Sequence, residues 1–256
     1  MKKQIIILWI ASFVIAFMAV YIGNILDKDY PITSTFGIDG KKVSYRFEKV
    51  HYGKDDYKVI IRTDVAEVTG KLFWKSDKDI NWKSKELKKS NLILFGDIPG
   101  LKPEHKLNYY VELYYNNKTF SLPDNHKTNL TLTFWGKIPS TINILEYLFL
   151  YLGLILAART GLEFFNDGKK SKVFGIFTVV FFLTLIALIN PLYLTYKFGF
   201  INTSIPPITR LFLWSDLTIF FIWVITLIII FRSSRFKFLP IVSAVLTIIL
   251  AAFFRG

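Results

Sequence analysis

Three polar side chains lie within otherwise apolar stretches in the second half of the chain: Glu146, Asn190 and Asp216. Counted from the expected outer ends of their helices, each lies five or six residues inward, which is roughly 8–9 Å at the helical rise. Arg210 precedes Asp216 by six residues and is expected nearer the outer end of the same helix. Ionisable groups at membrane depth are costly and tend to face a partner or a wet cavity. The spacing therefore predicts an intramembrane polar site formed by Glu146, Asn190, Arg210 and Asp216.

Each of these residues also has a structural interpretation. Ser215 and Asp216 are suited to capping a helix that begins at Leu217. The Asn190-Pro191 pair is suited to ending or kinking a helix, because proline removes a backbone donor. Glu146 is close enough to the expected outer boundary to extend toward the headgroups. From the sequence alone, one shared site and three separate structural roles are both open.

A second candidate is a basic surface patch with an aromatic residue among its lysines. Aromatic rings beside cations can hold anionic glycans or lipid headgroups by stacking and charge. Acidic residues are interleaved with the lysines, so a solvated strand edge and loop is the alternative. The patch consists of Lys71, Lys75, Trp82, Lys83, Lys85, Lys88 and Lys89.

The motifs of common enzyme classes are missing from the sequence. Its three histidines, His51, His105 and His126, all fall in expected turns, without a nucleophile motif nearby. Phosphate-binding loops, dinucleotide-binding motifs and metal-ligand spacings are likewise missing. The sequence thus predicts no catalytic, cofactor or metal site and favours a protein that is not an enzyme.

Long apolar runs must position the intramembrane candidates. One run covers Ile5–Tyr21 and four more fall within Thr141–Phe254, and their lengths match the ~20 residues that cross a bilayer as helix. We expect an N-terminal anchor at residues 1–26, retained because bulky residues precede Asp27 where a cleavage site needs small ones. A four-helix membrane domain is expected at residues 138–256, with spans at about 141–158, 173–195, 211–231 and 238–254.

Basic residues predict the orientation of these five spans. With the N-terminus inside, the outer segments beyond residues 27–137 hold three lysines or arginines, against nine in the inner segments, as the positive-inside rule requires. Enrichment in Ile, Lys, Asn and Phe indicates a bacterial source, hence an inner-membrane protein with residues 27–137 outside. The inner residues, expected to attract anionic headgroups, are Lys2, Lys3, Arg159, Lys169, Lys170, Lys172, Arg232, Arg235 and Lys237.

The formal charge of +13 is not a nucleic-acid signal once it is divided along the chain. Residues 27–137 hold 20 basic and 15 acidic side chains, a balance of +5, and the remaining +8 lies mainly on membrane flanks. A nucleic-acid partner is therefore not expected. Because the chain has no cysteine, it offers neither a disulfide framework nor a lipid-attachment site.

The segment at residues 27–137 shows alternating apolar residues of the β type. Val43, Tyr45 and Phe47 form one such set, and Leu107, Tyr109, Val111 and Leu113 form another. With breaks such as Ser76–Lys89 and Asp97–Glu104, the pattern predicts seven or eight short antiparallel strands. We expect an all-β sandwich.

One stretch resembles a known family. Gly96-Asp97-Ile98-Pro99-Gly100-Leu101-Lys102-Pro103, followed by Tyr109, is similar to the E–F corner of fibronectin type III and other immunoglobulin-like domains. The resemblance implies an immunoglobulin-like sandwich with a "tyrosine corner", although Tyr109 falls about two positions late. It also implies that Trp74 is the core tryptophan of an earlier strand.

A second stretch also carries a resemblance. The segment from Gly136 to Glu163 is similar to that of uncharacterised bacterial multi-helix membrane proteins with a comparable exported domain. This likeness implies only the architecture, because no activity accompanies it.

Two functions follow as hypotheses. The first is a non-enzymatic membrane protein whose extracytoplasmic sandwich is a binding or complex-assembly module, with a protein partner in the membrane or periplasm. The alternative is a transporter, channel or membrane-enzyme component with its site at Glu146, Asn190 and Asp216.

Overall fold

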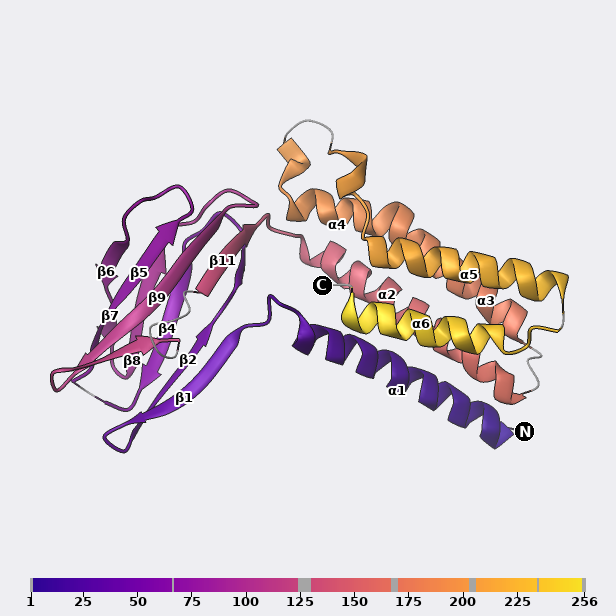
Figure 1. The fold of residues 1–256 in the computed structure, drawn as a ribbon, viewed down its shortest axis with the longest axis horizontal. Helices are drawn as coiled ribbons and strands as arrows, with labels where there is room; N and C mark the ends of the chain where they lie inside the picture. The colour runs from indigo at the N-terminus through magenta and orange to yellow at the C-terminus, as the bar shows by residue number, and fades with distance from the viewer. Residues whose placement is uncertain are drawn as a thin grey trace. The chain divides into compact units, whose positions relative to one another are not determined.

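The chain folds into two compact units. The computed structural model describes residues 2–65, 67–123, 130–166, 170–202, 206–233 and 235–254. The helical unit comprises Met1–Lys28, Ile138–Tyr196 and Phe200–Gly256 (Figure 1). The β-unit comprises Asp29–Lys137 together with Lys197–Gly199. Three residues from the second half of the sequence thus belong to the β-unit.

Two sheets form the β-unit. In the described residues the first has the strand order β1-β2-β4-β8-β7, and the second has the order β3-β11-β9-β5-β6, with β10 also paired to β9. The β3–β11 pair is parallel, and the other pairs are antiparallel. The strands are β1 (Ile32–Ile38), β2 (Lys41–Phe47), β3 (Val50–Tyr52), β4 (Tyr57–Thr63), β5 (Thr69–Ser76), β6 (Lys83–Glu86), β7 (Lys88–Ser90), β8 (Ile93–Ile98), β9 (Lys106–Tyr115), β10 (Lys118–Leu122) and β11 (Leu130–Trp135).

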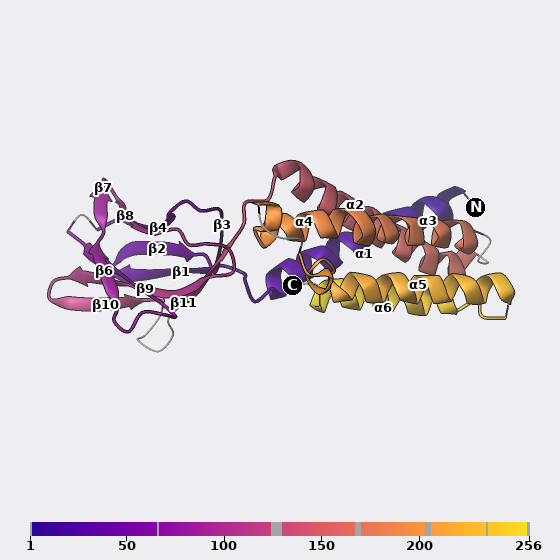
Figure 2. The same cartoon turned by 90° about the horizontal axis from the view of Figure 1, so that it is seen from above.

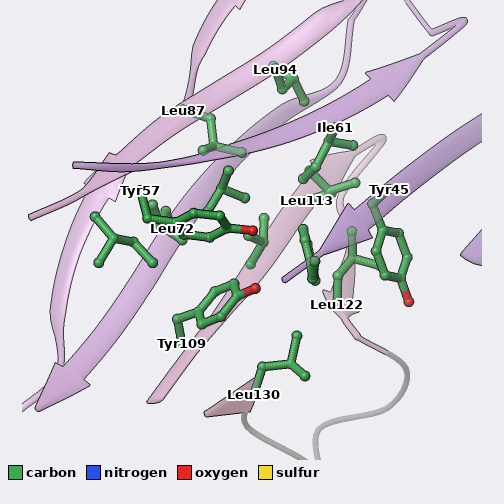
Figure 3. Packing of buried hydrophobic residues seen from close by; sticks show 14 of the residues in the cluster. Tyr45, Tyr57, Ile61, Leu72, Leu87, Leu94, Tyr109, Leu113, Leu122 and Leu130 are labelled. Atoms are coloured by element: carbon green, nitrogen blue, oxygen red, sulfur yellow. The ribbon is translucent and has the colours of Figure 1, made fainter. Parts of the chain in front are cut away.

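Alternating residues of both sheets fill a common core. Along β4, buried and exposed positions alternate over the whole strand, with Tyr57, Val59 and Ile61 facing inward. The core cluster takes inward residues from both sheets, including Leu94 of β8 and Leu113 of β9 (Figure 3). The sandwich-like β-structure expected from the period-two pattern is therefore present.

The expected strand inventory was incomplete. The described residues hold eleven strands. The pattern predicted Ser76–Lys89 as a break, but β6 lies within this range and β7 begins in it. Both are edge strands with every residue exposed. They show no alternation because neither has a buried face, so hydrophobic periodicity could not detect them.

Leu87, between β6 and β7, joins the two layers where the chain passes from one sheet to the other. A Cβ at Gly70 of β5 would lie 2.8 Å from one Leu87 methyl, and a Cβ at Gly96 of β8 would lie 2.7 Å from the other Leu87 methyl. Glycine at both positions makes the space that the leucine side chain occupies. Leu87 is itself buried.

The helical unit contains α1 and an antiparallel group of helices. Figures 1 and 2 show α2, α3, α5 and α6 running side by side. The helical segments are α1 (Lys2–Leu26), α2 (Ser140–Leu162), the 3-10 turn Glu163–Asn166, α3 (Ser171–Thr184), a π-helical turn at Leu185–Ile189, α4 (Asn190–Lys197), the 3-10 turns Phe200–Asn202 and Ile208–Arg210, α5 (Trp214–Arg232) and α6 (Leu239–Phe253).

In the described residues, four helical segments are long and apolar enough to cross a membrane: Lys3–Leu26, Ser140–Asn166, Ser171–Lys197 and Trp214–Arg232. The apolar helix α6 is shorter, with 15 residues, about 22 Å. The second of the four runs beyond its expected end at residue 158, and the fourth begins after residue 211.

Small residues allow these helices to pack closely. A Cβ at Gly161 of α2 would lie 2.6 Å from that of Ala244 of α6, and one at Gly23 of α1 would lie 3.2 Å from the Ala251 carbonyl. Large apolar side chains such as Phe13 and Phe221 are exposed, while polar ones, described below, are buried. This distribution is the one expected of helices surrounded by lipid.

Candidate functional site

Asn190 and Asp216 form a buried hydrogen bond in the helical unit. The Asn190 Nδ2 donates to Asp216 Oδ2 over 2.8 Å, and neither side chain is exposed. Asn190 opens α4, and Asp216 lies in the first turn of α5. The fold thus brings together two of the four residues predicted from sequence, although 26 positions separate them.

A π-helical turn positions Asn190. Pro191 has no N–H to donate to the carbonyl of Ala187. The Asn190 N–H donates to the carbonyl of Leu185, five residues back, and not to that of Ile186 as in an α-helix. The helix nevertheless continues to Lys197. Of the two interpretations of Asn190-Pro191, ending a helix or kinking it, the first is therefore wrong, because the extra residue in the turn accommodates the proline.

Asp216 is not a helix cap. The helix α5 begins at Trp214, and its N-cap position is Leu213, which makes no side-chain capping bond. Asp216 instead occupies the first turn, where the positive end of the helix dipole favours a carboxylate. The alternative interpretation, a cap for a helix that begins at Leu217, is therefore wrong, because Trp214 and Ser215 already belong to the helix.

Glu146 of α2 is buried within the helical unit. Because α2 and α3 are antiparallel, neighbours at one level have residue numbers with a nearly constant sum. Gly153 faces Phe182, and Thr160 contacts Thr178, which places Glu146 near the level of Asn190. Arg210 ends a 3-10 turn before α5 and has an exposed side chain.

Further buried polar contacts join α5 and α6 in this unit. The Trp223 indole Nε1 of α5 donates to Thr247 Oγ1 of α6 over 2.9 Å, and Thr226 and Ser243 hydroxyls lie 2.6 Å apart on the same two helices. Their residues are buried. Trp223 is thus a packing residue with a buried polar contact.

A buried ion pair lies at the other end of α2. Arg159 contacts Glu163, although the orientation of Arg159 Nη1 and Glu163 Oε2 does not meet hydrogen-bond geometry. The Arg159 guanidinium lies over the rings of Trp9 (5.5 Å) and Phe174 (4.9 Å). Glu163 Oε1 accepts from Asn166 Nδ2 at 2.8 Å. This cluster, which we call the Arg159 cluster, connects α1, α2 and α3.

The sequence placed Arg159 among the inner basic residues expected to attract anionic lipid headgroups. The lipid assignment is wrong because the side chain is buried. The i, i+4 spacing of Arg159 and Glu163 at the end of an apolar run was the signal that could have indicated a pair.

The basic patch on the β-unit is spread over the edge strands of both sheets. Lys83 and Lys85 are on β6, whereas Lys88 and Lys89 are on β7. Lys83 pairs with Asp79 at 3.0 Å and lowers the pKa of that carboxyl. Lys89 Nζ donates to the carbonyls of Val65 and Val68 at 3.4 and 3.3 Å.

An aromatic stack crosses the outer face of the second sheet. Phe73 and Tyr110 are opposite each other on β5 and β9, and their rings stack at 4.7 Å. Trp82 packs edge-on against Tyr110 at 4.9 Å, and Lys71 lies over Phe73 at 5.5 Å. Half-buried Lys75 follows on β5. The rings pack mainly against one another, so they brace the loop at residues 77–82.

The expected tyrosine corner is replaced by a longer connection. The Tyr109 hydroxyl donates to the carbonyl of Glu48, 61 residues upstream, over 2.8 Å, whereas a tyrosine corner bonds only a few residues back. Glu48 N–H in turn donates to the Tyr57 hydroxyl at 3.0 Å. Burial raises the pKa of both tyrosines. Trp74 is partly buried against the core.

Two of the three histidines contact backbone carbonyls. His51 Nε2 lies 3.0 Å from the Asp55 carbonyl oxygen, and His105 Nδ1 lies 3.2 Å from that of Pro103. His126 lies outside the described residues. Within the described ranges, no group of three or more His, Cys, Asp or Glu side chains is arranged to hold a metal ion.

Comparison with protein-family models gave no match, and comparison with curated proteins gave none either.

Proposed function

We propose that the chain is an integral membrane protein of the bacterial inner membrane, with five spans, a cytoplasmic N-terminus and an extracytoplasmic β-unit. The apolar exteriors of the four long helices support membrane insertion. In this proposal the fifth span is α6, whose 15 residues are short for a bilayer. Inner lysines and arginines outnumber the outer ones, which favours this orientation.

The β-unit is proposed to be an immunoglobulin-like sandwich. The neighbour order β2-β4-β8-β7 against β11-β9-β5 corresponds to the strand order ABED against GFC of such domains. The hairpin partner β1 and the strands β3, β6 and β10 are additions to that arrangement. The connection from Tyr109 to Glu48 departs from the family pattern.

The proposed role of the β-unit is non-enzymatic binding or complex assembly, with a protein partner in the membrane or periplasm. The observation that carries it is the loop at residues 77–82. Ile80 is 89% exposed and Trp82 is 37% exposed, next to the aromatic stack. Large apolar side chains presented on a rigid support, with lysines around them, are typical of an interaction surface.

The test is site-specific photocrosslinking from position 80 in cells, combined with the substitution Ile80→Ser. We expect a discrete crosslinked partner and a roughly tenfold or larger loss of co-purification in the variant. The matched control is Ile60→Ser, which alters an exposed isoleucine on β4 of the other sheet. Equal co-purification in all three proteins would contradict the role of this loop.

The buried hydrogen bond from Asn190 to Asp216 favours a second candidate, a transporter, channel or membrane-enzyme component with a polar intramembrane site. A double-mutant cycle of Glu146→Gln and Asp216→Asn tests it through thermal stability in detergent. If the residues share a site, the effect of the double variant on the free energy of unfolding should differ from the sum of the single effects by about 0.5–3 kcal/mol, the usual coupling energy of neighbouring residues. Small additive effects would remove the candidate.

A further inference from the structure

The Asn190 side chain has one polar atom for which the described residues supply no hydrogen bond. Its Nδ2 donates to Asp216, while its Oδ1 is buried and without a partner. A reversed amide would place Oδ1 against a carboxylate oxygen, two acceptors together, so the observed orientation is the favourable one. A buried acceptor in this position indicates an additional group that offers positive charge or a proton.

The backbone beside Asn190 adds oxygen atoms to this environment. The carbonyl of Ala187 loses its usual α-helical donor because Pro191 has no N–H. The carbonyl of Ile186 loses its usual donor because the Asn190 N–H bonds to Leu185. Carbonyls released by such irregular turns in membrane helices are used elsewhere to coordinate cations.

The chemistry of these atoms indicates what the additional group is. Carboxylate, amide and backbone oxygens are the ligands that hard cations prefer.

We propose that Asn190 Oδ1 and the Asp216 carboxylate bind a small hard metal cation in the outer half of the helical unit, with Glu146 at the same level. This inference rests on the second candidate function, since it names the ligand class of that site.

The test measures the thermal unfolding midpoint of the full-length protein in detergent. Choline chloride is compared with the chlorides of Na⁺, K⁺, Mg²⁺ and Ca²⁺ at constant ionic strength. We expect one or more of these cations to raise the midpoint saturably, by roughly 5–10 °C at a hundredfold excess over Kd. An identical midpoint in all five salts would overturn the proposal and indicate a bound water molecule instead.

Variants identify the ligands. Asp216→Asn preserves size and should abolish the cation-dependent shift, and Asn190→Leu should do the same by removing Oδ1. If Asn190→Leu does not fold, Asn190→Asp provides the second measurement, because the added carboxylate should increase the shift. The control Thr226→Val breaks the contact to Ser243 in the same unit and should lower the midpoint equally in every salt. Retention of the full shift in Asp216→Asn would overturn the assignment.

Flux measurements in liposomes separate this inference from the candidate function. Cation-dependent stability without flux of the same cation supports the site and argues against transport. Flux of a solute by a protein whose stability is the same in all five salts overturns the cation site while supporting a transport function.

Discussion

Glu163 has the clearest energetic role of any single residue in the helical unit. Its carboxylate contacts the buried Arg159 guanidinium and also accepts from Asn166 and the Lys170 backbone N–H. Removing one partner of a buried pair leaves the other charge without compensation. The loss is then larger than the net value of the pair itself.

We predict that Glu163→Gln lowers the free energy of unfolding by about 3–5 kcal/mol. The double variant Arg159→Met, Glu163→Leu should lose considerably less, because no buried charge remains. Thermal or denaturant unfolding of the detergent-solubilised protein measures both. A Glu163→Gln variant within about 1 kcal/mol of wild type would contradict the importance of the Arg159 cluster.

Tyr109 provides a pH-dependent test in the β-unit. Burial raises its pKa well above the ordinary value, and a hydrogen bond to Glu112 raises the pKa of Tyr114 to about 12. A raised pKa in the folded state means that the stabilisation is complete below the unfolded pKa of about 10 and is lost as pH rises above it. We expect the β-unit to unfold progressively in alkali, with tyrosinate absorbance from Tyr109 appearing only as unfolding occurs.

The substitution Tyr109→Phe removes the hydrogen bond to Glu48 and the alkaline ionisation together. We expect a loss of about 1 kcal/mol at neutral pH and a smaller decline of stability above pH 10 than in wild type. Chemical unfolding at a series of pH values is the measurement. The same alkaline decline in both proteins would show that other groups control it.

At the scale of elements, the long apolar helices and the core strands were predictable because each repeats a simple pattern along the sequence. The sequence also suggested Asn190 and Asp216 as members of one site, although it left separate structural roles for them open. The π-helical turn was not predictable, since it depends on how Pro191 is accommodated between packed helices. The edge strands β6 and β7 depend on pairing with β5 and β8, which local pattern does not contain.

Leu87 tests how the two sheets are held together. We predict that Leu87→Ala destabilises the β-unit by about 2–5 kcal/mol, because the space beside Gly70 and Gly96 would be left empty. The measurement is the unfolding transition of the β-structure in the full-length protein. The matched control is Leu92→Ala, which truncates an exposed leucine between β7 and β8. It should lower the free energy of unfolding by only about 0.5 kcal/mol, as is usual for surface substitutions.

At the scale of the whole molecule, orientation in the membrane is the main quantity to measure. Reporter fusions at Asn125 and Gly256 should be extracytoplasmic, and fusions at Asp167 and Ser233 should be cytoplasmic. The reason is the excess of basic residues on the inner segments. An inside reporter at Gly256 alone would show that α6 does not cross the bilayer, whose thickness exceeds the ~22 Å length of this helix.

Overall architecture followed from the order of the apolar and alternating segments, but the function did not. A binding surface and an intramembrane site both fit that architecture, because a fold is compatible with many functions. The side-chain contacts connected Asn190 to Asp216, and they gave several patch lysines partners within the β-unit.

The β-unit is not continuous in sequence. The Gly136 N–H donates to the Lys197 carbonyl over 2.7 Å, and the Trp135 ring packs edge-on against Phe198 at 5.5 Å. Lys197–Gly199 is translated about sixty residues after the last strand. During synthesis, the β-unit therefore acquires its final contacts only after the residues of α2, α3 and α4 have been translated, so the last part of the β-unit to be made follows most of the helical unit in time.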